Sequence, residues 1–323
     1  MTDRALSPVV RFAPAKLNLT LSVGPRRQDG FHDLHSVMVP LGIADRLSVA
    51  PAHDASDSLH VTGEDGPPRP DDLVLRAIGA ARIAVARSTD AFALAARLEK
   101  RIPIAAGLGG GSSDAAAAID AALAAWGTER AIEERIAMAA AVGSDVPFFL
   151  VGGPALAEGK GERLTALRLP TGEPVGIVLV TPRLEVSTTE AFRRLDAGGD
   201  AAPSDPRSTR LTSEHLAAEL RAGLSGASLV ARAGVLASAN DLINATHALV
   251  PDLRPFRRAV GRRLGHPVGQ SGSGPTLWAI YPSLAAAEAA AGTLRTAVAA
   301  GELVAPGGEP PWIQATALAG RAE

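Results

Sequence analysis

The sequence predicts an α+β fold in two lobes, and three observations support this prediction. Short β-type runs are interleaved with helical segments along the chain, so that many strand pairings must join distant residues. An apolar, β-branched run at residues 175–181 follows a turn-rich stretch, which places the best boundary near residues 165–174. The length of 323 residues suits one large or two ordinary domains. We therefore divide the chain into residues 1–172 and 173–323.

The N-terminal half is expected to combine strands with a few helices. Alternating or continuous apolar residues predict strands at residues 9–12, 17–23, 34–41, 46–50 and 92–98. A turn containing Gln28-Asp29-Gly30 is typical of a hairpin. Asp71 or Asp72 is expected to cap a helix that reaches about residue 87. Further helices are predicted at residues 113–126 and between Thr128, as the cap, and Gly143.

The C-terminal half is expected to pair a small sheet with several helices. The run at residues 175–181 predicts a buried strand, because a strand covered on both faces is apolar at every position. Residues 196–209 are rich in Ala, Gly, Pro, Asp and Ser, and we interpret them as a mobile surface linker. Helices are predicted near residues 212–222, 240–249, 252–264 and 283–299, and strands at residues 276–281 and 312–318.

Composition excludes several classes of protein. Hydrophobic residues make up 46% of the chain and charged residues 20%, which is typical of a soluble globular protein. The formal net charge of -2 lacks the basic excess of nucleic-acid-binding proteins. The chain has no cysteine, which excludes disulfides and thiolate chemistry, and no apolar run is long enough to span a membrane. The first ten residues do not form a signal peptide, so a cytoplasmic location is expected.

A glycine-rich stretch at residues 103–113 is the main candidate for a binding site. Four glycines within five positions, Gly107 and Gly109 to Gly111, allow a ligand to approach the backbone closely. Ser112 or Ser113 is interpreted as the N-cap of the Ala-rich helix that follows, whose free N–H groups and dipole favour a phosphate. The alternative is a flexible connector. The stretch matches neither the Walker motif nor the dinucleotide-binding motif.

Two charged residues are candidates for catalysis at such a site. Asp145 precedes an apolar patch and could act as a general base, although capping of the turn after Gly143 is the simpler interpretation. Only three of the 32 basic residues are lysines, which draws attention to each of them. Lys16 lies between two apolar strands and could stabilise an anion or position Asp145, or it could be a surface lysine at a sheet edge. Asn18 is expected on the same strand face.

Phe31 and His32 form an aromatic pair after the predicted hairpin turn. An aromatic ring beside an imidazole could stack on a flat base and form hydrogen bonds with its edge, although a core phenylalanine with a satisfied histidine is the alternative.

Four segments together resemble a known superfamily. Residues 13–19, 103–113, 143–149 and 271–276 are similar, in the same order, to the motifs of the galactokinase, homoserine kinase, mevalonate kinase and phosphomevalonate kinase superfamily. Within it, Asp29-Gly-Phe-His32 and Gly107-Leu-Gly-Gly-Gly-Ser-Ser113 resemble the 4-diphosphocytidyl-2-C-methyl-D-erythritol kinase family. The resemblance implies an N-terminal lobe like domain 2 of ribosomal protein S5, a ferredoxin-like C-terminal lobe, and an active site between them.

The resemblance also implies a reaction and roles for particular residues. The γ-phosphate of ATP would be transferred to the 2-hydroxyl of the methylerythritol unit, in the non-mevalonate route to isoprenoid precursors. Asp145 would be the general base with Lys16 as its partner, and Asn18 would line the same site. Phe31, His32, Thr188 and Phe192 would form the cytidine pocket. The ATP phosphates would lie against Pro103, Ile104, Ala105, Ala106, Gly107, Leu108, Gly109, Gly110, Gly111, Ser112 and Ser113.

Magnesium is expected on the nucleotide, with Ser112 and Ser113 as candidate ligands, and no nucleic-acid or membrane partner is expected.

Two other functions stay open at this point. One is a different small-molecule kinase of the same superfamily, acting on homoserine, a sugar or mevalonate. The other is a nucleotide-binding regulator without catalysis, although such a protein would need neither Lys16 nor Asp145.

Overall fold

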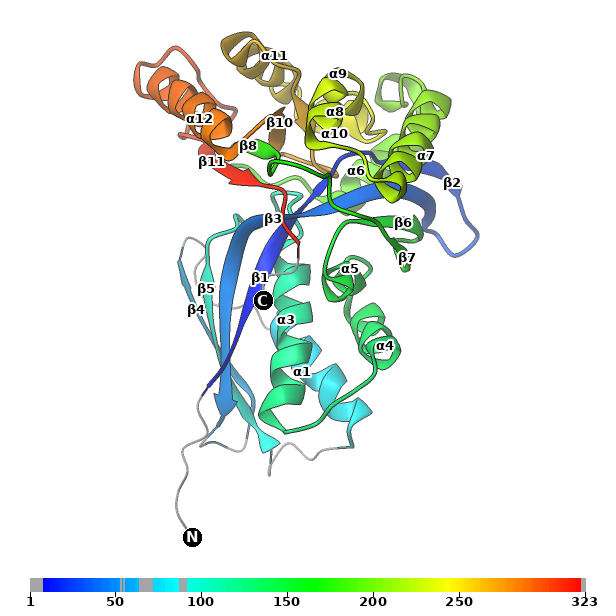
Figure 1. Ribbon diagram of the computed structural model, residues 1–323, viewed down its shortest axis with the longest axis vertical. Helices are drawn as coiled ribbons and strands as arrows, with labels where there is room; N and C mark the ends of the chain where they lie inside the picture. The colour runs from blue at the N-terminus through cyan, green and yellow to red at the C-terminus, as the bar shows by residue number, and fades with distance from the viewer. Residues whose placement is uncertain (1–7, 53, 55, 64–71, 87–91, 321–323) are drawn as a thin grey trace.

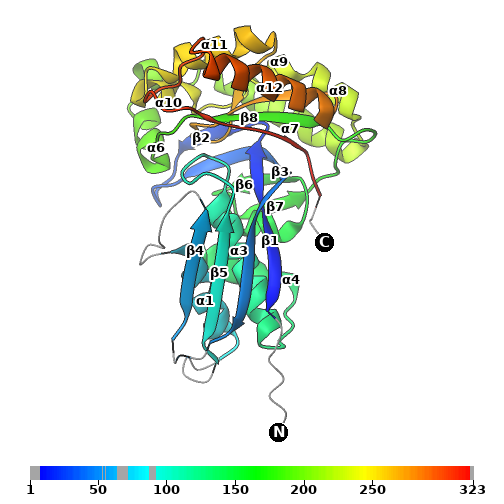
Figure 2. The same ribbon diagram turned by 90° about the vertical axis from the view of Figure 1, so that its left-hand side faces the viewer.

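The computed structural model describes residues 8–52, 54, 56–63, 72–86 and 92–320. Its elements form a lower lobe from the N-terminal half and an upper lobe from the C-terminal half, stacked along the long axis (Figure 1). Strand β3 (His32–Pro51) begins beneath the helices of the upper lobe and runs down through the lower lobe, as Figure 2 shows from the side. The site described below lies where the two lobes meet.

Seven strands of the described residues form the sheet of the lower lobe, with β3 at its centre. The strands that pair antiparallel with β3 are β1 (Val9–Asn18), β2 (Ser22–Arg26), β5 (Leu94–Lys100) and β6 (Ala155–Gly159). Beyond them, β4 (Ser58–Gly63) is parallel to β5, and β7 (Arg163–Ala166) is antiparallel to β6. The separate strands predicted at residues 34–41 and 46–50 are one strand, because pairing with β1 keeps Ala44 and Asp45 extended. The predicted hairpin joins β2 to β3.

Helices cover one face of this sheet. They are α1 (Leu73–Ala84), α3 (Gly110–Ala125), α4 (Ile132–Val142) and α5 (Val146–Val151). Asp72 caps α1 by accepting a hydrogen bond from the Val74 N–H at 2.8 Å, whereas Asp71 and the helix end predicted at residue 87 lie outside the described residues. Thr128 does not cap α4. Its N–H instead donates a hydrogen bond to a carbonyl oxygen at the C-terminal end of α3. At the start of α4, the Glu134 side chain accepts from the N–H of Ala131.

The upper lobe contains, among the described residues, a four-stranded antiparallel sheet in the order β11-β8-β10-β9. Its strands are β8 (Gly176–Thr181), β9 (Gly269–Gln270), β10 (Leu277–Tyr281) and β11 (Trp312–Ala317). Alternate side chains of β8 belong to two cores: Ile177 and Leu179 pack toward the lower lobe, whereas Val178 and Val180 pack with α11 (Leu253–Leu264) and α12 (Leu284–Ala299). Burial on both faces explains the continuous apolar run in the sequence.

The linker predicted at residues 196–209 is partly helical. It contains a short 3-10 turn at Gly199–Ala201 and the start of α7 (Pro206–Ala222). The side chain of Asp205 caps α7 by accepting from the N–H of Ser208, and Pro206 occupies the first turn, where its missing N–H costs nothing. The helices around this segment are α6 (Thr188–Asp196), α8 (Gly226–Ala231), α9 (Ala233–Leu236) and α10 (Ile243–Leu249).

One apolar core joins the two lobes. Leu17 and Val39 of the lower sheet lie in the same buried cluster as Leu179 and Trp278 of the upper sheet. The predicted α+β class with two lobes is confirmed, and the division at residue 172 stays a prediction. No helix in the described part of the chain is both long and apolar enough to cross a bilayer.

Candidate active site between the lobes

The glycine loop, residues 103–113, connects β5 to the N-terminus of α3. Gly109 is the N-cap of α3 with φ 69°, so the helix begins at Gly110 and not after Ser112 or Ser113, as the sequence had suggested. A Cβ at Gly109 would lie 2.9 Å from both Lys16 Cγ and Phe149 Cζ, and one at Gly107 would lie 2.4 Å from the Ser271 carbonyl oxygen. Side chains at these two positions would therefore push the loop away from its neighbours. The first N–H groups of the 16-residue helix α3 favour an anion at this loop.

Lys16 lies on β1, directly beside the glycine loop. A bulge between Pro14 and Lys16 interrupts the pairing with β3, and the Lys16 N–H donates to the Leu108 carbonyl instead, at 2.8 Å. The side chain is 6% exposed, and its Nζ lies 3.7 Å from Asp145 Oδ2. Burial lowers the pKa of Lys16, and the neighbouring Asp145 carboxylate opposes this shift. Lys16 is therefore a buried cation at the loop, and not a surface lysine at a sheet edge.

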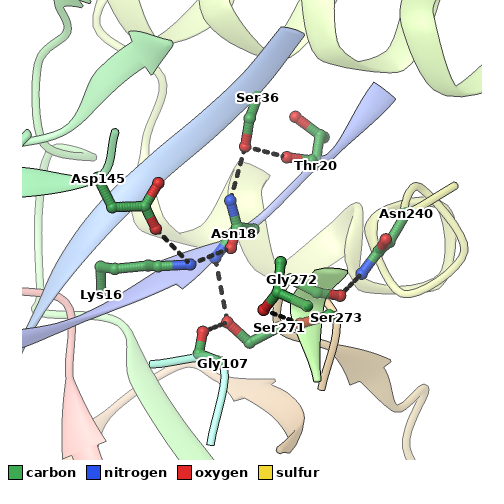
Figure 3. Close-up of polar contacts among 11 residues, drawn as sticks. Lys16, Asn18, Thr20, Ser36, Gly107, Asp145, Asn240, Ser271, Gly272 and Ser273 are labelled. Carbon is green, nitrogen blue, oxygen red and sulfur yellow. Dashed lines mark hydrogen bonds and ion pairs between the residues drawn. The ribbon is translucent and has the colours of Figure 1, made fainter. Parts of the chain in front are cut away.

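Asp145 occupies the N-cap position of α5, but its side chain accepts no hydrogen bond from that helix. Instead its carboxylate faces Lys16 (Figure 3) and keeps 41% of its side-chain surface exposed. The simple capping interpretation is therefore wrong. A carboxylate that is accessible and held near a buried ammonium group can accept a proton from a bound alcohol.

Asn18 holds the ammonium group of Lys16 from the other side. Its Oδ1 accepts from Lys16 Nζ at 2.6 Å, and its Nδ2 donates to Ser36 Oγ at 2.8 Å. Ser36 Oγ donates in turn to the Thr20 carbonyl oxygen at 2.6 Å. Because a carbonyl oxygen only accepts, the single hydroxyl proton of Ser36 is committed to Thr20, and Ser36 must accept from Asn18. The chain of bonds in Figure 3 thus fixes the amide orientation and presents Oδ1 to Lys16.

A second glycine turn, residues 271–275, supports the glycine loop from the upper lobe. Ser271 Oγ donates to the Gly107 carbonyl oxygen at 2.9 Å, and the Thr276 N–H donates to the Ala106 carbonyl at 3.3 Å. Asn240 Nδ2 holds the turn by donating to the carbonyl oxygen of Gly272 (Figure 3) and to that of Gln270. The sequence analysis identified residues 271–276 only as a family motif and assigned no role to Asn240 or Ser271, because their partners lie far away along the chain.

A cavity of about 520 Å³, which we call the site hollow, brings most of the predicted residues together. Its lining includes Lys16, Asn18, Asp145, Thr188, Phe192 and the loop residues Pro103 to Gly107 and Gly109 to Ser112. Leu108, Ser113, Phe31 and His32 do not line it. Leu108 is a core residue, and Ser113 is buried with its hydroxyl unpaired, in the wall of a different cavity.

Of the four predicted cytidine residues, Thr188 and Phe192 line the site hollow, whereas Phe31 and His32 do not. Thr188 Oγ1 is 2.9 Å from Ser273 Oγ, and Phe192 lies beside His32 with 5.3 Å between ring centroids. His32 is buried, with Nδ1 2.9 Å from the Gly24 carbonyl and Nε2 3.2 Å from Asp196. The carbonyl can only accept, so Nδ1 donates to it, and Nε2 faces the Asp196 carboxylate. Phe31 is 53% exposed, with the Lys160 ammonium group 4.9 Å from its ring centroid.

A buried charged triad of Lys100, Asp45 and Asp114 lies next to the glycine loop, and sequence reasoning missed it. Lys100 and Asp114 also line the site hollow. Lys100 Nζ lies 2.5 Å from Asp45 Oδ2 and 2.7 Å from Asp114 Oδ2, and all three side chains are almost fully buried. Burial alone would lower the pKa of Lys100, but the two carboxyl groups more than offset this and raise it. Burial raises the pKa of Asp114 to about 8, with Lys100 opposing and Asp45 adding to the shift. The rarity of lysine in the sequence was the one signal that pointed to Lys100.

The side chains around the loop offer few ligands for magnesium. No group of three or more His, Cys, Asp and Glu side chains suited to a metal occurs among the residues that the structure describes. Ser112 lines the site hollow, but Ser113 does not, so only Ser112 remains a candidate of the two. Asp114 is a poor ligand, because its side chain is almost fully buried and Lys100 occupies one of its oxygens. These residues fit an ion carried mainly by phosphates and water.

Comparison with known proteins gives the same fold and a specific set of relatives. A model of the GHMP kinases N terminal domain matches residues 72–153. The chain is 40% identical to the 4-diphosphocytidyl-2-C-methyl-D-erythritol kinase of Deinococcus radiodurans over 292 residues, which cover 89% of this chain and 90% of the relative. The enzyme of that name from Pelotomaculum thermopropionicum is 36% identical over 288 residues, covering 89% and 94%.

Solved structures agree with these relatives. A crystal structure of 4-(cytidine 5'-diphospho)-2C-methyl-D-erythritol kinase matches with a TM-score of 0.68 and 34% identity, covering 97% of this chain and all of that one. L. major mevalonate kinase matches with a TM-score of 0.69 but only 14% identity, which shows a shared fold alone. The two-lobed site and the near full-length identity lead to one conclusion: the chain belongs to the 4-diphosphocytidyl-2-C-methyl-D-erythritol kinase family of the GHMP kinases.

Proposed function

We propose that this protein transfers the γ-phosphate of ATP to the 2-hydroxyl group of 4-diphosphocytidyl-2-C-methyl-D-erythritol, in the non-mevalonate route to isoprenoid precursors. The observation that carries the proposal is the pair formed by Lys16 and Asp145, with Nζ 3.7 Å from Oδ2, at the mouth of the glycine loop. The two residues are 129 positions apart in the chain and come from different elements. A protein that only senses a nucleotide would need neither of them.

The chain's own groups suggest how the transfer proceeds. The Asp145 carboxylate accepts the proton of the substrate hydroxyl as its oxygen forms a bond to the γ-phosphorus, and the bond from that phosphorus to the β–γ bridging oxygen breaks to release ADP. Lys16 donates toward the charge that develops on the transferred group. Asn18 and Asp145 both contact its ammonium group, which fixes Lys16 before the substrate binds.

The remaining loop residues support ATP binding. The phosphates would lie at the N-terminus of α3, against the N–H groups of Gly110, Gly111 and Ser112. Val61, Leu73 and Leu98 line an apolar part of the site hollow that suits the adenine ring. Magnesium, when bound to the nucleotide, neutralises phosphate charge, and the Ser112 hydroxyl is the side chain that would contact it.

The cytidine end of the substrate would contact the predicted aromatic residues. His32 would form a hydrogen bond with the edge of the cytosine base, and Phe192 offers a ring face at the end of the site hollow. Phe31 has the exposed surface needed for stacking, and Thr188 presents a hydroxyl group nearby. This end favours an acceptor with a nucleobase over homoserine, a sugar or mevalonate. The enzyme would act without nucleic-acid or membrane partners, in the cytoplasm.

Replacement of Asp145 tests the proposal. We expect Asp145→Ala and the isosteric Asp145→Asn to lower kcat by ~10²–10⁴-fold with little change in ATP affinity, because the base acts in the transition state. Glu133→Gln, on the exposed first turn of α4, is the control and should leave kcat unchanged. Initial rates of ADP release are measured with the cytidine substrate and with homoserine, mevalonate and galactose. Normal turnover by both Asp145 variants would refute the role of Asp145, and equal rates with all acceptors would refute the substrate.

A further inference from the structure

A second large hollow lies in the upper lobe, among α7, α9, α10 and α11. Its volume is about 1150 Å³, and it shares no lining residue with the site hollow. We call it the basic hollow. Three arginines of α11 line it, Arg254, Arg257 and Arg258, together with His247 of α10. The spacing of the arginines places them on one helix face.

The positive charge of these arginines is not neutralised within the described residues. None of the three forms an ion pair with a described carboxylate. Arg257 is partly buried, and its guanidinium group is fixed by bonds to two carbonyl oxygens, Nε to Val268 at 2.6 Å and NH2 to Ala237 at 2.7 Å. Carbonyl oxygens orient a guanidinium group but do not cancel its charge, and a buried charge normally has a partner of opposite sign.

The acidic residues of the basic hollow are already engaged. Asp200 pairs with Arg194 at 2.7 Å, Asp205 caps α7, and Asp241 accepts from the Val23 N–H at 2.9 Å. Burial raises the pKa of Asp241, and the Val23 N–H opposes this shift. None of these carboxylates pairs with an arginine of α11 in the described residues, so the three guanidinium groups can still bind an anion that enters the hollow.

His247 gives independent support. Its side chain is 6% exposed, and its Nε2 has no hydrogen-bond partner. Burial, followed by repulsion from Arg257, Arg254 and Arg258, lowers the pKa of His247 to about 4. A buried imidazole facing three uncompensated cations lacks the anion that would stabilise all four groups.

We propose that the basic hollow binds a small phosphorylated metabolite, whose diphosphate group is held by Arg254, Arg257 and Arg258. Guanidinium groups suit phosphate oxygens because their N–H donors form paired hydrogen bonds, and Arg257 is already oriented for this. The hollow is large enough for a diphosphate that carries an organic group. Asn240 lies in its wall while its side chain holds the second glycine turn, so the ligand would lie close behind the active site.

Titration with inorganic pyrophosphate tests this site. The full chain is first saturated with a non-hydrolysable ATP analogue, which occupies the glycine loop, and heat is then measured as pyrophosphate is added. We expect one saturable event in the natural protein and at least ~10-fold weaker affinity in Arg254→Ala/Arg258→Ala. The matched control is Arg262→Ala/Arg263→Ala, on the same helix but outside the lining of the hollow, which should bind as the natural protein does.

A second measurement reports on the hollow without a substitution among its arginines. The imidazole pKa of His247 is followed by NMR, with His247→Gln used to assign the signal. Pyrophosphate should raise this pKa from its low value, because the anion offsets the repulsion of the arginines. Absence of a saturable event, equal weakening in both double variants, or an unchanged His247 pKa at saturating pyrophosphate would each overturn the proposal.

Discussion

Two buried lysines pack against neighbouring residues of the glycine loop, yet their surroundings differ sharply. A Cβ at Gly109 would lie 2.9 Å from Lys16 Cγ, and one at Gly110 would lie 3.2 Å from Lys100 Nζ. Lys100 contacts two carboxyl groups within 2.7 Å, whereas Lys16 has one amide oxygen at 2.6 Å and a carboxylate at 3.7 Å. Accordingly, the pKa of Lys100 is raised and that of Lys16 is lowered.

The difference separates a stabilising cation from one that is available for chemistry. The partners of Lys100 are buried, so its charge is neutralised inside the protein and has little left to offer a ligand. Asp145, the partner of Lys16, keeps access to the site hollow and lies beyond ideal hydrogen-bond distance. Lys16 therefore keeps donor capacity for a phosphate or a developing alkoxide. Loss of Lys16 should affect turnover, and loss of Lys100 should affect stability.

The substitution Lys16→Met should have the largest effect of those considered, and this effect is on kcat. We expect kcat to fall by ~10²–10⁴-fold, because a preorganised charge at the reacting group is removed. Stability should not decrease. A depressed lysine pKa means that the folded protein binds the proton less tightly than the unfolded chain, so the charged lysine costs stability at neutral pH. Steady-state rates and guanidinium denaturation measure both quantities. A variant with full turnover, or one that loses stability alone, would contradict the comparison.

Lys100→Met should have the opposite profile. Removal of the cation leaves Asp45 and Asp114 buried at close range without a counter-charge, and breaking a buried pair in this way costs about 3–5 kcal/mol. Lys160→Met is the matched control, since that lysine is 37% exposed and should change the free energy of unfolding by less than about 1 kcal/mol. The comparison fails if denaturation midpoints of the two variants coincide.

The sequence allowed the site to be predicted where a local pattern carries the information. The glycine loop, the apolar strand β8 and the position of Asp145 before an apolar helix are all local features. The start of α3 was misplaced because a glycine with positive φ, Gly109, takes the N-cap role that serine usually has. The start of α7 was missed because the signal Asp205-Pro206 stands inside a stretch of linker-like composition.

Contacts between distant residues could not be predicted in this way. Asp45 meets Lys100 across 55 positions, and Ser271 meets Gly107 across 164, so no short pattern records either pairing. The residues alone left Lys16 open between a partner of Asp145 and a surface lysine, and only the family resemblance favoured the pair. The roles of Asn240 and Ser36 depend on which carbonyl or hydroxyl groups the fold brings near them, and these became visible only in three dimensions.

A pH titration of stability sharpens the account of the triad. The folded-state pKa of Asp114, about 8, is raised above its ordinary value of 3.8, so the folded protein holds a proton that the unfolded chain has already lost. Stability from this group is complete below about pH 4 and is lost as the pH rises to about 8, by at most ~1.4 kcal/mol per pH unit. Asp114→Asn should remove this slope. The free energy of unfolding is measured between pH 5 and pH 9 in both proteins, and parallel curves would refute the assignment.

The smallest expected effect concerns the hydrogen-bond chain behind Lys16. Ser36→Ala removes the acceptor that fixes the amide of Asn18, so Oδ1 no longer stays directed at Lys16 Nζ. One such bond is worth about 1 kcal/mol, and we expect kcat to fall about 5-fold with an unchanged KM for ATP. Ser36→Thr keeps the hydroxyl and should restore most of kcat. Ser48→Ala, on the same strand but away from the site hollow, should have no effect. An equal fall in kcat for Ser36→Ala and Ser48→Ala would show that β3 acts only as a scaffold.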